Sequence, residues 1–262
     1  MHLQPFGDIM NDIMKIKNIN EIFNIKKGDV ISVVGSGGKT TLMFKLAEVL
    51  KEEYKVLITT SAKIYKPSIG EYDFLYINMK EYYASKICCN EKNSITVLSN
   101  GIDLDKNKLI GINDEELASV VNDFDIILIE ADGSRGLPLK GWKSYEPPIL
   151  NRTNKTIGVI PIDAVNTEIN ENLIYGFDEF KKIVGDTLHI DYKAVGKLCS
   201  DDQGLFKNSM GERYLYINRT DSEKDVVNSI NLAEYLKNNI VGNPYNFKIC
   251  FGSLKQAVFY ET

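Results

Sequence analysis

Histidine and arginine are scarce in this chain of 262 residues. Its two histidines, His2 and His189, leave almost nothing from which to build a catalytic triad or a histidine-rich metal centre. Arginine occurs only four times, and 31 basic residues stand against 36 acidic ones, for a formal net charge of −5. This balance argues against a nucleic-acid partner bound on a broad basic face, because phosphate neutralisation needs clustered Lys and Arg.

Cysteine is also rare, and long apolar runs are absent. The four cysteines are Cys88, Cys89, Cys199 and Cys250. No pair of them has C-x-x-C spacing, so we expect reduced and mostly buried thiols in a reducing compartment. Residues 1–18 carry acidic side chains and no uninterrupted apolar segment, unlike a signal peptide. No run approaches the ~18 apolar residues of a membrane span, so we expect a cytoplasmic protein with no membrane partner.

Short apolar runs alternate with segments of helical period, which is the pattern of an α/β fold. The expected strands lie at 30–34, 56–60, 74–77, 95–98, 126–129, 156–160, 214–217 and 247–251. The expected helices lie at 41–53, 114–122, 178–184 and 222–237, with a further β excursion at 99–112. Several strands are apolar throughout, so we predict a mostly parallel sheet with helices on both faces. No linker divides the chain, so a single domain is predicted over 22–262, after an N-terminal extension of residues 1–21.

The strongest motif is a glycine-rich turn between the first expected strand and helix, D-V-I-S-V-V-G-S-G-G-K-T-T at 29–41. Glycines let backbone N–H groups wrap a phosphate, and the helix N-terminus adds unpaired donors. We expect Lys39 to be exposed and to point at the β- and γ-phosphates, and the Thr40 hydroxyl to bind Mg²⁺. The predicted nucleotide-binding residues here are Gly35, Ser36, Gly37, Gly38, Lys39, Thr40 and Thr41. The fold is therefore predicted to be P-loop NTPase-like.

The loop is shorter than the full G-x-x-x-x-G-K-[ST] pattern, because Val33 stands where the first glycine belongs. The remaining G-x-x-G-K-T resembles the loop of Mur-type ligases and of some NTPases that insert metals or build cofactors. A structural turn with a chance lysine is the alternative, and the strand–loop–helix context argues against it.

A second strand ends in carboxylates, in D-I-I-L-I-E-A-D-G-S-R-G at 125–136. Glu130 and Asp132 are two residues apart, so in an extended chain both point to one side, beyond the carboxyl end of the sheet. We predict that Glu130 joins Thr40 in holding Mg²⁺, through water, and that both acids act in catalysis together with Lys39. Solvated acids at a strand end are the alternative. Arg135 is predicted to stabilise charge on a transferring phosphate, or else only the turn.

Two weaker patterns lie at other strand ends. Thr59 and Thr60 carry hydroxyls that would face the nucleotide, although threonine is common at strand ends. Asn218 and Asp221, in Y-I-N-R-T-D at 216–221, resemble the N-K-x-D motif, whose Asp accepts hydrogen bonds from guanine. Arg219 replaces the lysine of that motif and can also stack on a base. The alternative is a helix start capped by Asp221.

Residues 131–155 combine Gly, Pro and Lys without any period, and a loop of this length is uncommon unless it is functional. The first part of this segment, the loop 131–148, contains Arg135, Lys140 and the only tryptophan of the chain, Trp142. We expect its first residues beside the γ-phosphate and Trp142 exposed to a partner, so that the loop signals the nucleotide state. A rigid loop that covers the sheet is the alternative.

The chain resembles the YqeC family in five segments that occur in the same order: VVGSGGKTT, VLITTSAKIYKP, ILIEADGSRGLPLKGWKSYEPP, QGLFKN and YINRTD. This is a family of accessory proteins assigned to selenium-dependent molybdenum hydroxylases. The resemblance covers roughly residues 22–260, and the segment 130–140 is its most specific part. Tyr145 stands where a histidine often precedes Glu-Pro, so no histidine acts at that position.

The motif residues predict binding and hydrolysis of ATP or GTP with Mg²⁺. The resemblance implies that the protein assists the maturation of a selenium-dependent molybdenum hydroxylase. The implied partners are that hydroxylase or its cofactor-maturation proteins. The residues leave two other functions open. One is phosphoryl transfer to a small acceptor, as in Mur-type ligases or kinases, and the other is a nucleotide sensor that does not hydrolyse.

Overall fold

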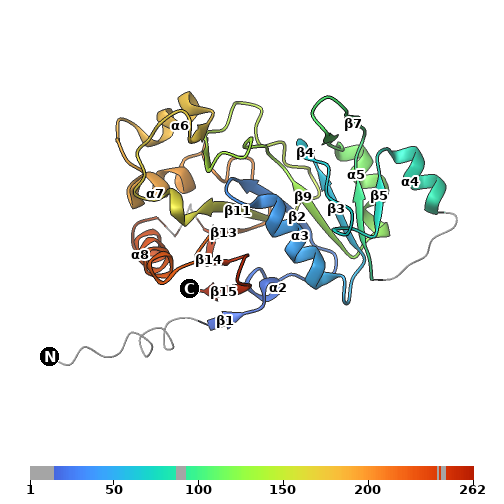
Figure 1. Ribbon diagram of the computed structural model, residues 1–262, viewed down its shortest axis with the longest axis horizontal. Coiled ribbons are helices and arrows are strands. Elements are labelled where there is room, and N and C mark those ends of the chain that lie inside the picture. Colours follow the sequence, from blue (N-terminus) through green and yellow to red (C-terminus); the bar gives the residue numbers. More distant parts are fainter. Residues whose placement is uncertain (1–14, 87–92, 241, 243–245) are drawn as a thin grey trace.

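A ten-stranded sheet forms the centre of the protein in the computed structural model, which describes residues 15–86, 93–240, 242 and 246–262 (Figure 1). Its strand order is β1-β15-β14-β13-β11-β2-β9-β3-β6-β5. In that order the strands span Lys15–Lys17, Val258–Glu261, Lys248–Ser253, Glu212–Asn218, Lys155–Pro161, Val30–Gly35, Ile126–Glu130, Val56–Thr60, Ile95–Leu98 and Phe74–Tyr76. The strands from β14 to β5 pair in parallel, and β15 and β1 add an antiparallel edge. The predicted mostly parallel sheet is confirmed.

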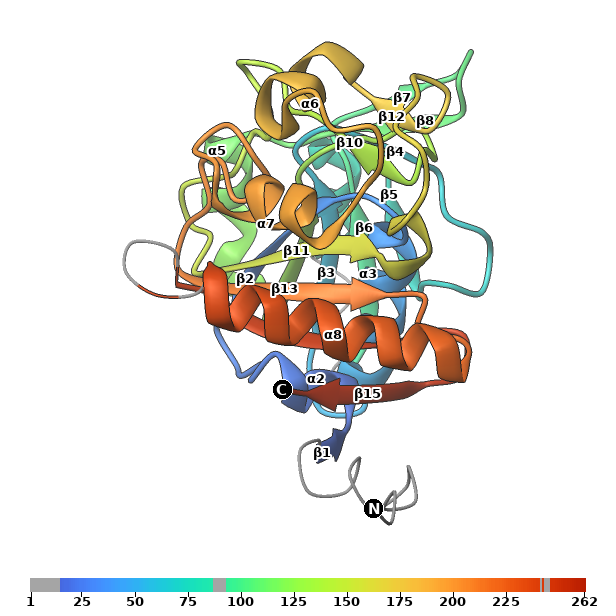
Figure 2. The same ribbon diagram turned by 90° about the vertical axis from the view of Figure 1, so that its left-hand side faces the viewer.

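Helices cover both faces of this sheet, as the apolar strands predict. One face packs on α2 (Ile19–Ile22) and α3 (Lys39–Leu50). The other face packs on α4 (Met79–Lys86) and α5 (Asp114–Val120) over its β3 and β9 strands. Further along the same face lie α6 (Phe177–Val184), α7 (Tyr192–Ser200) and α8 (Glu223–Asn239). Figure 2 shows α7 and α8 lying in front of the strands.

All eight predicted strands and all four predicted helices are present, with ends shifted by a few residues. The segment 99–112, predicted to be β structure, contains β7 (Ile102–Asp103) and β8 (Lys108–Ile110). These two strands form a three-stranded sheet with β4 (Lys63–Tyr65). A parallel pair joins β10 (Leu139–Lys140) to β12 (Ile174–Tyr175). Two 3₁₀ turns, Val121–Asp123 and Ile162–Ala164, complete the described elements. Asp221 does not cap α8, because Ser222 is the N-cap residue and forms a capping box with Asp225.

The described residues before position 24 belong to the same core. Strand β1 pairs with β15, and Ile19, Ile22 and Phe23 are buried against α3 and the sheet. Among the residues that the structure describes, none of the helices has the length and apolar composition needed to cross a membrane.

Two of the four cysteines fall in the described part of the chain. Cys199 and Cys250 are free and buried, as expected, and burial raises the pKa of both thiols. Cys88 and Cys89 lie outside the described residues.

The strand order brings the two sequence motifs together. Strand β2 carries the glycine loop and lies between β9 and β11, with Val33 opposite Glu130 and Gly35 opposite Val159. From β2 the chain crosses to β3 on one side, whereas from the adjacent β9 it crosses to β11 on the other side, so the direction of the connections reverses between β2 and β9. In parallel sheets a ligand site forms beyond the carboxyl ends of strands at such a switch point.

Candidate functional site

The glycine loop turns sharply between β2 and α3. Gly35, Gly37 and Gly38 have φ of +95°, +76° and +126°, which L side chains rarely adopt. A Cβ on Gly35 would lie 2.3 Å from the carbonyl oxygen of Val159, and one on Gly37 would lie 2.4 Å from Cγ of Pro161. Glycine is therefore required here both by the backbone conformation and by the close approach of β11.

Neighbouring segments hold the loop in place. The backbone N–H of Ser36 donates to the carbonyl oxygen of Val159 at 3.0 Å, and the Ser36 hydroxyl donates to the Pro138 carbonyl oxygen at 2.7 Å. On the opposite side, Nδ2 of Asn218 donates to the carbonyl oxygen of Gly37 at 2.7 Å. The loop thus has a fixed shape before any ligand arrives, which reduces the entropy lost on binding.

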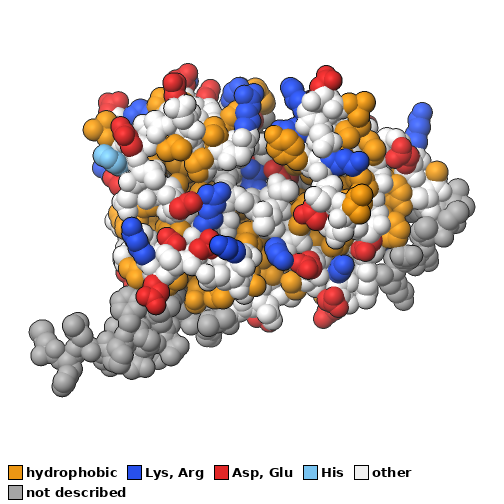
Figure 3. Space-filling model, viewed as in Figure 1, with side chains coloured by type: hydrophobic (Ala, Val, Ile, Leu, Met, Phe, Trp, Pro, Cys, Tyr) orange, Lys and Arg blue, Asp and Glu red, His pale blue; other side chains and the backbone are white. Residues whose placement is uncertain are grey.

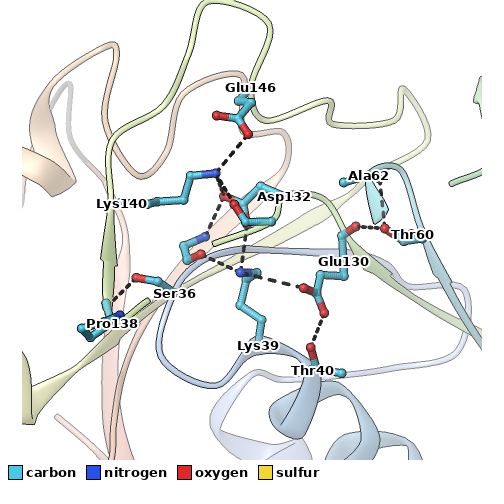
Figure 4. Close-up of polar contacts among 12 residues, drawn as sticks. Ser36, Lys39, Thr40, Thr60, Ala62, Glu130, Asp132, Pro138, Lys140 and Glu146 are labelled. Atoms are coloured by element: carbon cyan, nitrogen blue, oxygen red, sulfur yellow. Dashed lines mark hydrogen bonds and ion pairs between the residues drawn. The ribbon is translucent and has the colours of Figure 1, made fainter. Parts of the chain in front are cut away.

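Lys39 is the first residue of α3 and is buried, with 4% of its surface exposed. Its Nζ donates to the carbonyl oxygen of Gly35 at 2.7 Å and lies 3.2 Å from Oδ1 of Asp132 and 3.9 Å from Oε1 of Glu130 (Figure 4). The expectation of an exposed lysine is wrong, because two carboxylates and a carbonyl group draw the ammonium group under the loop. It lies where the loop and the carboxylate strand meet.

Thr40 and Glu130 are in direct contact. The Thr40 hydroxyl donates to Oε2 of Glu130 at 2.6 Å. Glu130 ends β9 and is 6% exposed, and this burial raises the pKa of its carboxyl group, whereas Lys39 and the hydrogen bond from Thr40 act in the opposite direction. Thr40 and Thr41 are exposed at the start of α3, so their hydroxyls are accessible to a ligand.

Asp132 is enclosed more completely than Glu130, with 1% of its surface exposed. Its Oδ2 accepts hydrogen bonds from the backbone N–H of Gly35 at 3.1 Å and from Nε1 of Trp142 at 2.9 Å. Its Oδ1 accepts no hydrogen bond from any residue that the structure describes, although Nζ of Lys39 is 3.2 Å away. The structure therefore brings both acids to Lys39, and neither is a solvated acid at a strand end.

The loop 131–148 folds back over Asp132 instead of projecting from the protein. Trp142 is 4% exposed, so the expectation that it faces a partner is wrong: its indole N–H is used to satisfy the buried carboxylate. Lys140 is also buried, and its Nζ lies 3.4 Å from Asp132 and from Glu146. A buried cation beside two carboxylates reduces the cost of enclosing their charge.

A cleft of about 220 Å³ opens above the glycine loop. It is lined by Gly37, Gly38, Lys39, Thr40, Thr41, Lys63, Ile64, Tyr65, Lys108, Glu130, Gly133, Ser134, Arg135, Gly136 and Arg219. Figure 3 shows several Lys and Arg side chains gathered in the upper middle of this face. Lys63, Tyr65 and Lys108 were not expected at the site, because they come from strands too short to give a periodic signal.

Asn218 and Asp221 do not line this cleft, although Arg219 between them does. Asn218 is buried behind the loop, and its Oδ1 has no hydrogen-bond partner among the described residues. Asp221 is exposed and accepts a hydrogen bond of 2.5 Å from the Ser253 hydroxyl. The Asn218 side chain therefore contacts the loop, whereas the exposed Asp221 side chain is bonded to Ser253.

The threonines that end β3 do not point free hydroxyls at the cleft. The hydroxyl of Thr59 donates to the carbonyl oxygen of Leu98, and that of Thr60 to the carbonyl oxygen of Glu130, both at 2.7 Å. These bonds join β3 to its neighbours, so the hydroxyls have a structural use.

Within the described ranges, no group of three or more His, Cys, Asp or Glu side chains is placed to hold a metal ion. Mg²⁺ at nucleotide sites does not need such a group, because it keeps several waters and takes phosphate oxygens with one or two protein ligands. The Thr40 hydroxyl and the Glu130 carboxylate, in contact at 2.6 Å, are oxygen ligands of the required kind.

Comparisons with known proteins place these features in one family. The family model described as YqeC protein matches residues 31–178, which include the glycine loop, the carboxylate strand and the loop 131–148. The chain is 29% identical over 223 residues to "Uncharacterized protein YqeC" of Escherichia coli (strain K12), covering 82% of this chain and 86% of that protein. No solved structure matches the chain.

Proposed function

The chain belongs to the YqeC family, and from its site we propose that it binds a nucleoside triphosphate with Mg²⁺ and hydrolyses the terminal phosphate bond. One observation carries the proposal. A sharply turned glycine loop at the start of α3 places Lys39 and Thr40 against the same carboxylate, Glu130, which ends the adjacent parallel strand. This is the arrangement that phosphoryl chemistry requires of a P-loop.

The loop supplies the donors for the phosphates. The first N–H groups of α3 have no partner within the helix, and its dipole favours negative charge at this end. Lys39 has three donors, of which one is used on the carbonyl oxygen of Gly35. A phosphate oxygen can therefore take the remaining donors of Lys39, while Asp132 keeps the lysine close to the loop.

Glu130 and Thr40 are the proposed protein ligands of Mg²⁺, Glu130 through water. Bound Mg²⁺ supplies charge neutralisation for the phosphates. The raised pKa of Glu130 suits it to accept a proton from the attacking water. Arg135, exposed on the cleft wall, is proposed to stabilise the charge that develops on the transferring phosphate.

The base is proposed to lie near Asp221, with guanine preferred over adenine. Asp221 is exposed and comes three residues after Asn218, whose side chain contacts the loop, and its carboxylate can accept two hydrogen bonds from guanine. The hydroxyl of Ser253 already donates to one of its oxygens and holds the side chain in position.

The proposed role is assistance in the maturation of a selenium-dependent molybdenum hydroxylase in the cytoplasm. Its support is the likeness of the sequence motifs to those of the family. The test measures phosphate release from MgATP and MgGTP by the protein alone and together with a purified hydroxylase of this class. Phosphate release that increases when the hydroxylase is added, and that Glu130→Gln abolishes, would support the proposal. A rate of phosphate release that the hydroxylase does not change would contradict this role.

Phosphoryl transfer to a small acceptor is the second candidate, favoured by one observation. The cleft continues past Lys39 to Lys63 and Lys108 of the small sheet, which leaves space and charge beside the terminal phosphate. Stoichiometric phosphorylation of an added acceptor would identify this reaction. Tight nucleotide binding with no phosphate release under any condition would instead identify a sensor.

A further inference from the structure

The cleft has a second wall that the nucleotide loop does not provide. Strands β4 and β8 of the small sheet contribute Lys63, Tyr65 and Lys108, opposite the glycine loop. Five lining residues are basic, and Glu130 is the only acidic one. Such an excess of positive charge in a concave site favours a ligand with several negative charges.

Three of the five cations have carboxylate partners. Besides Lys39, Nζ of Lys63 lies 3.1 Å from Asp103, and Arg219 lies 2.9 Å from Asp163. Both of these pairs are exposed, so solvent screens them and a ligand can compete for the cations.

The other two, Lys108 and Arg135, form no ion pair with a carboxylate in the part of the chain that the structure describes. Each lies over an aromatic ring instead: Nζ of Lys108 is 4.3 Å from the centre of Tyr65, and the guanidinium of Arg135 is 5.2 Å from that of Tyr175. Cation–π contacts orient a charged group without neutralising it. Two oriented cations that form no ion pair among the described residues therefore line the cleft.

The backbone at the two cleft arginines is unusual. Arg135 and Arg219 have φ of +53° and +62°. Eight non-glycine residues in the described ranges have positive φ, and five of them are asparagine, the residue that tolerates this conformation best. An arginine side chain does not stabilise a positive φ by a local hydrogen bond, as asparagine can. Residues held in such a disfavoured backbone conformation cluster at sites that bind ligands.

We propose that the region between Lys63, Lys108 and Arg135 binds a second small molecule that carries a phosphate group, next to the terminal phosphate of the nucleotide. This rests on the proposed function, which assigns the glycine loop to the triphosphate. A phosphate monoester brings two negative charges and three acceptor oxygens, so it can contact cations from both walls at once. Lys108 and Glu130 line the same cleft, so a ligand held by Lys108 lies in the cavity that also contains the proposed reaction site.

The test uses the full chain saturated with Mg²⁺ and AMPPNP or GMPPNP, whichever binds more tightly, so that the loop and the terminal phosphate position are filled. Glycerol 3-phosphate is then titrated by calorimetry, with succinate as a dicarboxylate in a parallel titration. We expect glycerol 3-phosphate to bind and succinate to bind more weakly. Lys108→Gln and Lys63→Gln should each weaken glycerol 3-phosphate binding about 10-fold while leaving the affinity for the analogue unchanged. Lys224→Gln, the same charge change at an exposed position of α8, should have no effect.

Three results would overturn the proposal. Glycerol 3-phosphate does not bind the loaded protein, or binds equally well to Lys108→Gln. Succinate binds as tightly, which would assign the site to carboxylates. Lys108→Gln weakens the triphosphate analogue but not the diphosphate, which would assign this lysine to the nucleotide. Failure of the analogue itself to bind is visible before the probe is added and contradicts the proposed function; Lys108-dependent binding of glycerol 3-phosphate to the free protein would then still support the second site.

Discussion

The ammonium group of Lys39 lies 3.2 Å from Oδ1 of Asp132, and both side chains are buried. Asp132 also accepts from the N–H of Gly35 and from the indole of Trp142. The first residue of α3 is therefore connected to the loop 131–148 through a single carboxylate. A ligand that takes donors from Lys39 changes the charge balance around Asp132, and the loop is placed to respond.

Lys39→Ala should lower the free energy of unfolding by about 3 kcal/mol in the absence of nucleotide. Removing the Lys39 ammonium group leaves the negative charges of the buried Glu130 and Asp132 carboxylates with less nearby positive charge. Removal of one partner of a buried ion pair typically lowers the free energy of unfolding by about this amount. Urea unfolding would measure the change. Lys45→Ala is the control on α3, because Lys45 is half exposed and its ion pair with Glu48 lies on the surface, so its change should stay below about 0.5 kcal/mol. Equal stability of Lys39→Ala and wild type would show that the buried pair contributes nothing.

Glu130→Gln should bind nucleotide but release phosphate at least about 100-fold more slowly, because an amide cannot accept the proton of the attacking water. Asp132→Asn should affect binding more than turnover, since Asp132 positions Lys39 and the Gly35 N–H. Single-turnover phosphate release and calorimetric affinities would separate the two effects. The opposite pattern, with turnover lost only in Asp132→Asn, would exchange the roles of the two acids.

Trp142 fluorescence should differ between the complexes with a triphosphate analogue and with the diphosphate. The indole N–H donates to the Asp132 carboxylate, which also contacts Lys39, so a change at the terminal phosphate reaches the ring through two residues, Lys39 and Asp132. Arg135→Ala should reduce the difference if that arginine contacts the terminal phosphate. Acrylamide should quench the emission poorly in every state, because the ring is buried. Identical spectra in both complexes would indicate a loop that only covers the sheet.

Asp221→Asn should relax a preference for GTP toward xanthine nucleotides, because the xanthine ring carries an oxygen where guanine has an amine. Competition binding among GTP, ATP and XTP would measure it. Ser253→Ala is the matched control, since it removes the hydroxyl that holds Asp221 but keeps the carboxylate. Tighter binding of ATP than of GTP by the wild type would contradict the guanine assignment.

The main sheet could be predicted from the sequence because its strands are buried on both faces. Strands β3 (Val56–Thr60) and β9 (Ile126–Glu130) are buried at every position, and each begins with an uninterrupted apolar segment, 56–58 and 126–129. The β4 and β8 strands have three residues each, too few to show any period. Their lysines became candidate ligand residues only when the fold placed them opposite the glycine loop.

The strand–turn–helix context of the glycine loop could be predicted from its motif, but the charges that surround Lys39 could not. Burial of Lys39 depends on Glu130 and Asp132, which are about ninety residues away along the chain. The same holds for Trp142: an isolated tryptophan among lysines and prolines looks exposed, and only the position of Asp132 shows why its N–H points inward. Local sequence does not contain such long-range pairings.

The central claim, that the glycine loop holds a nucleoside triphosphate, is tested most directly by calorimetric titration of wild type and Lys39→Ala with MgATP and MgGTP. We expect the wild type to bind at least one of them and Lys39→Ala to bind it at least about 100-fold more weakly, with circular dichroism confirming that the variant is folded. Lys39→Arg, which keeps the charge, should retain part of the affinity. Binding of neither nucleotide by the wild type, or equal binding by a folded Lys39→Ala, would contradict the claim.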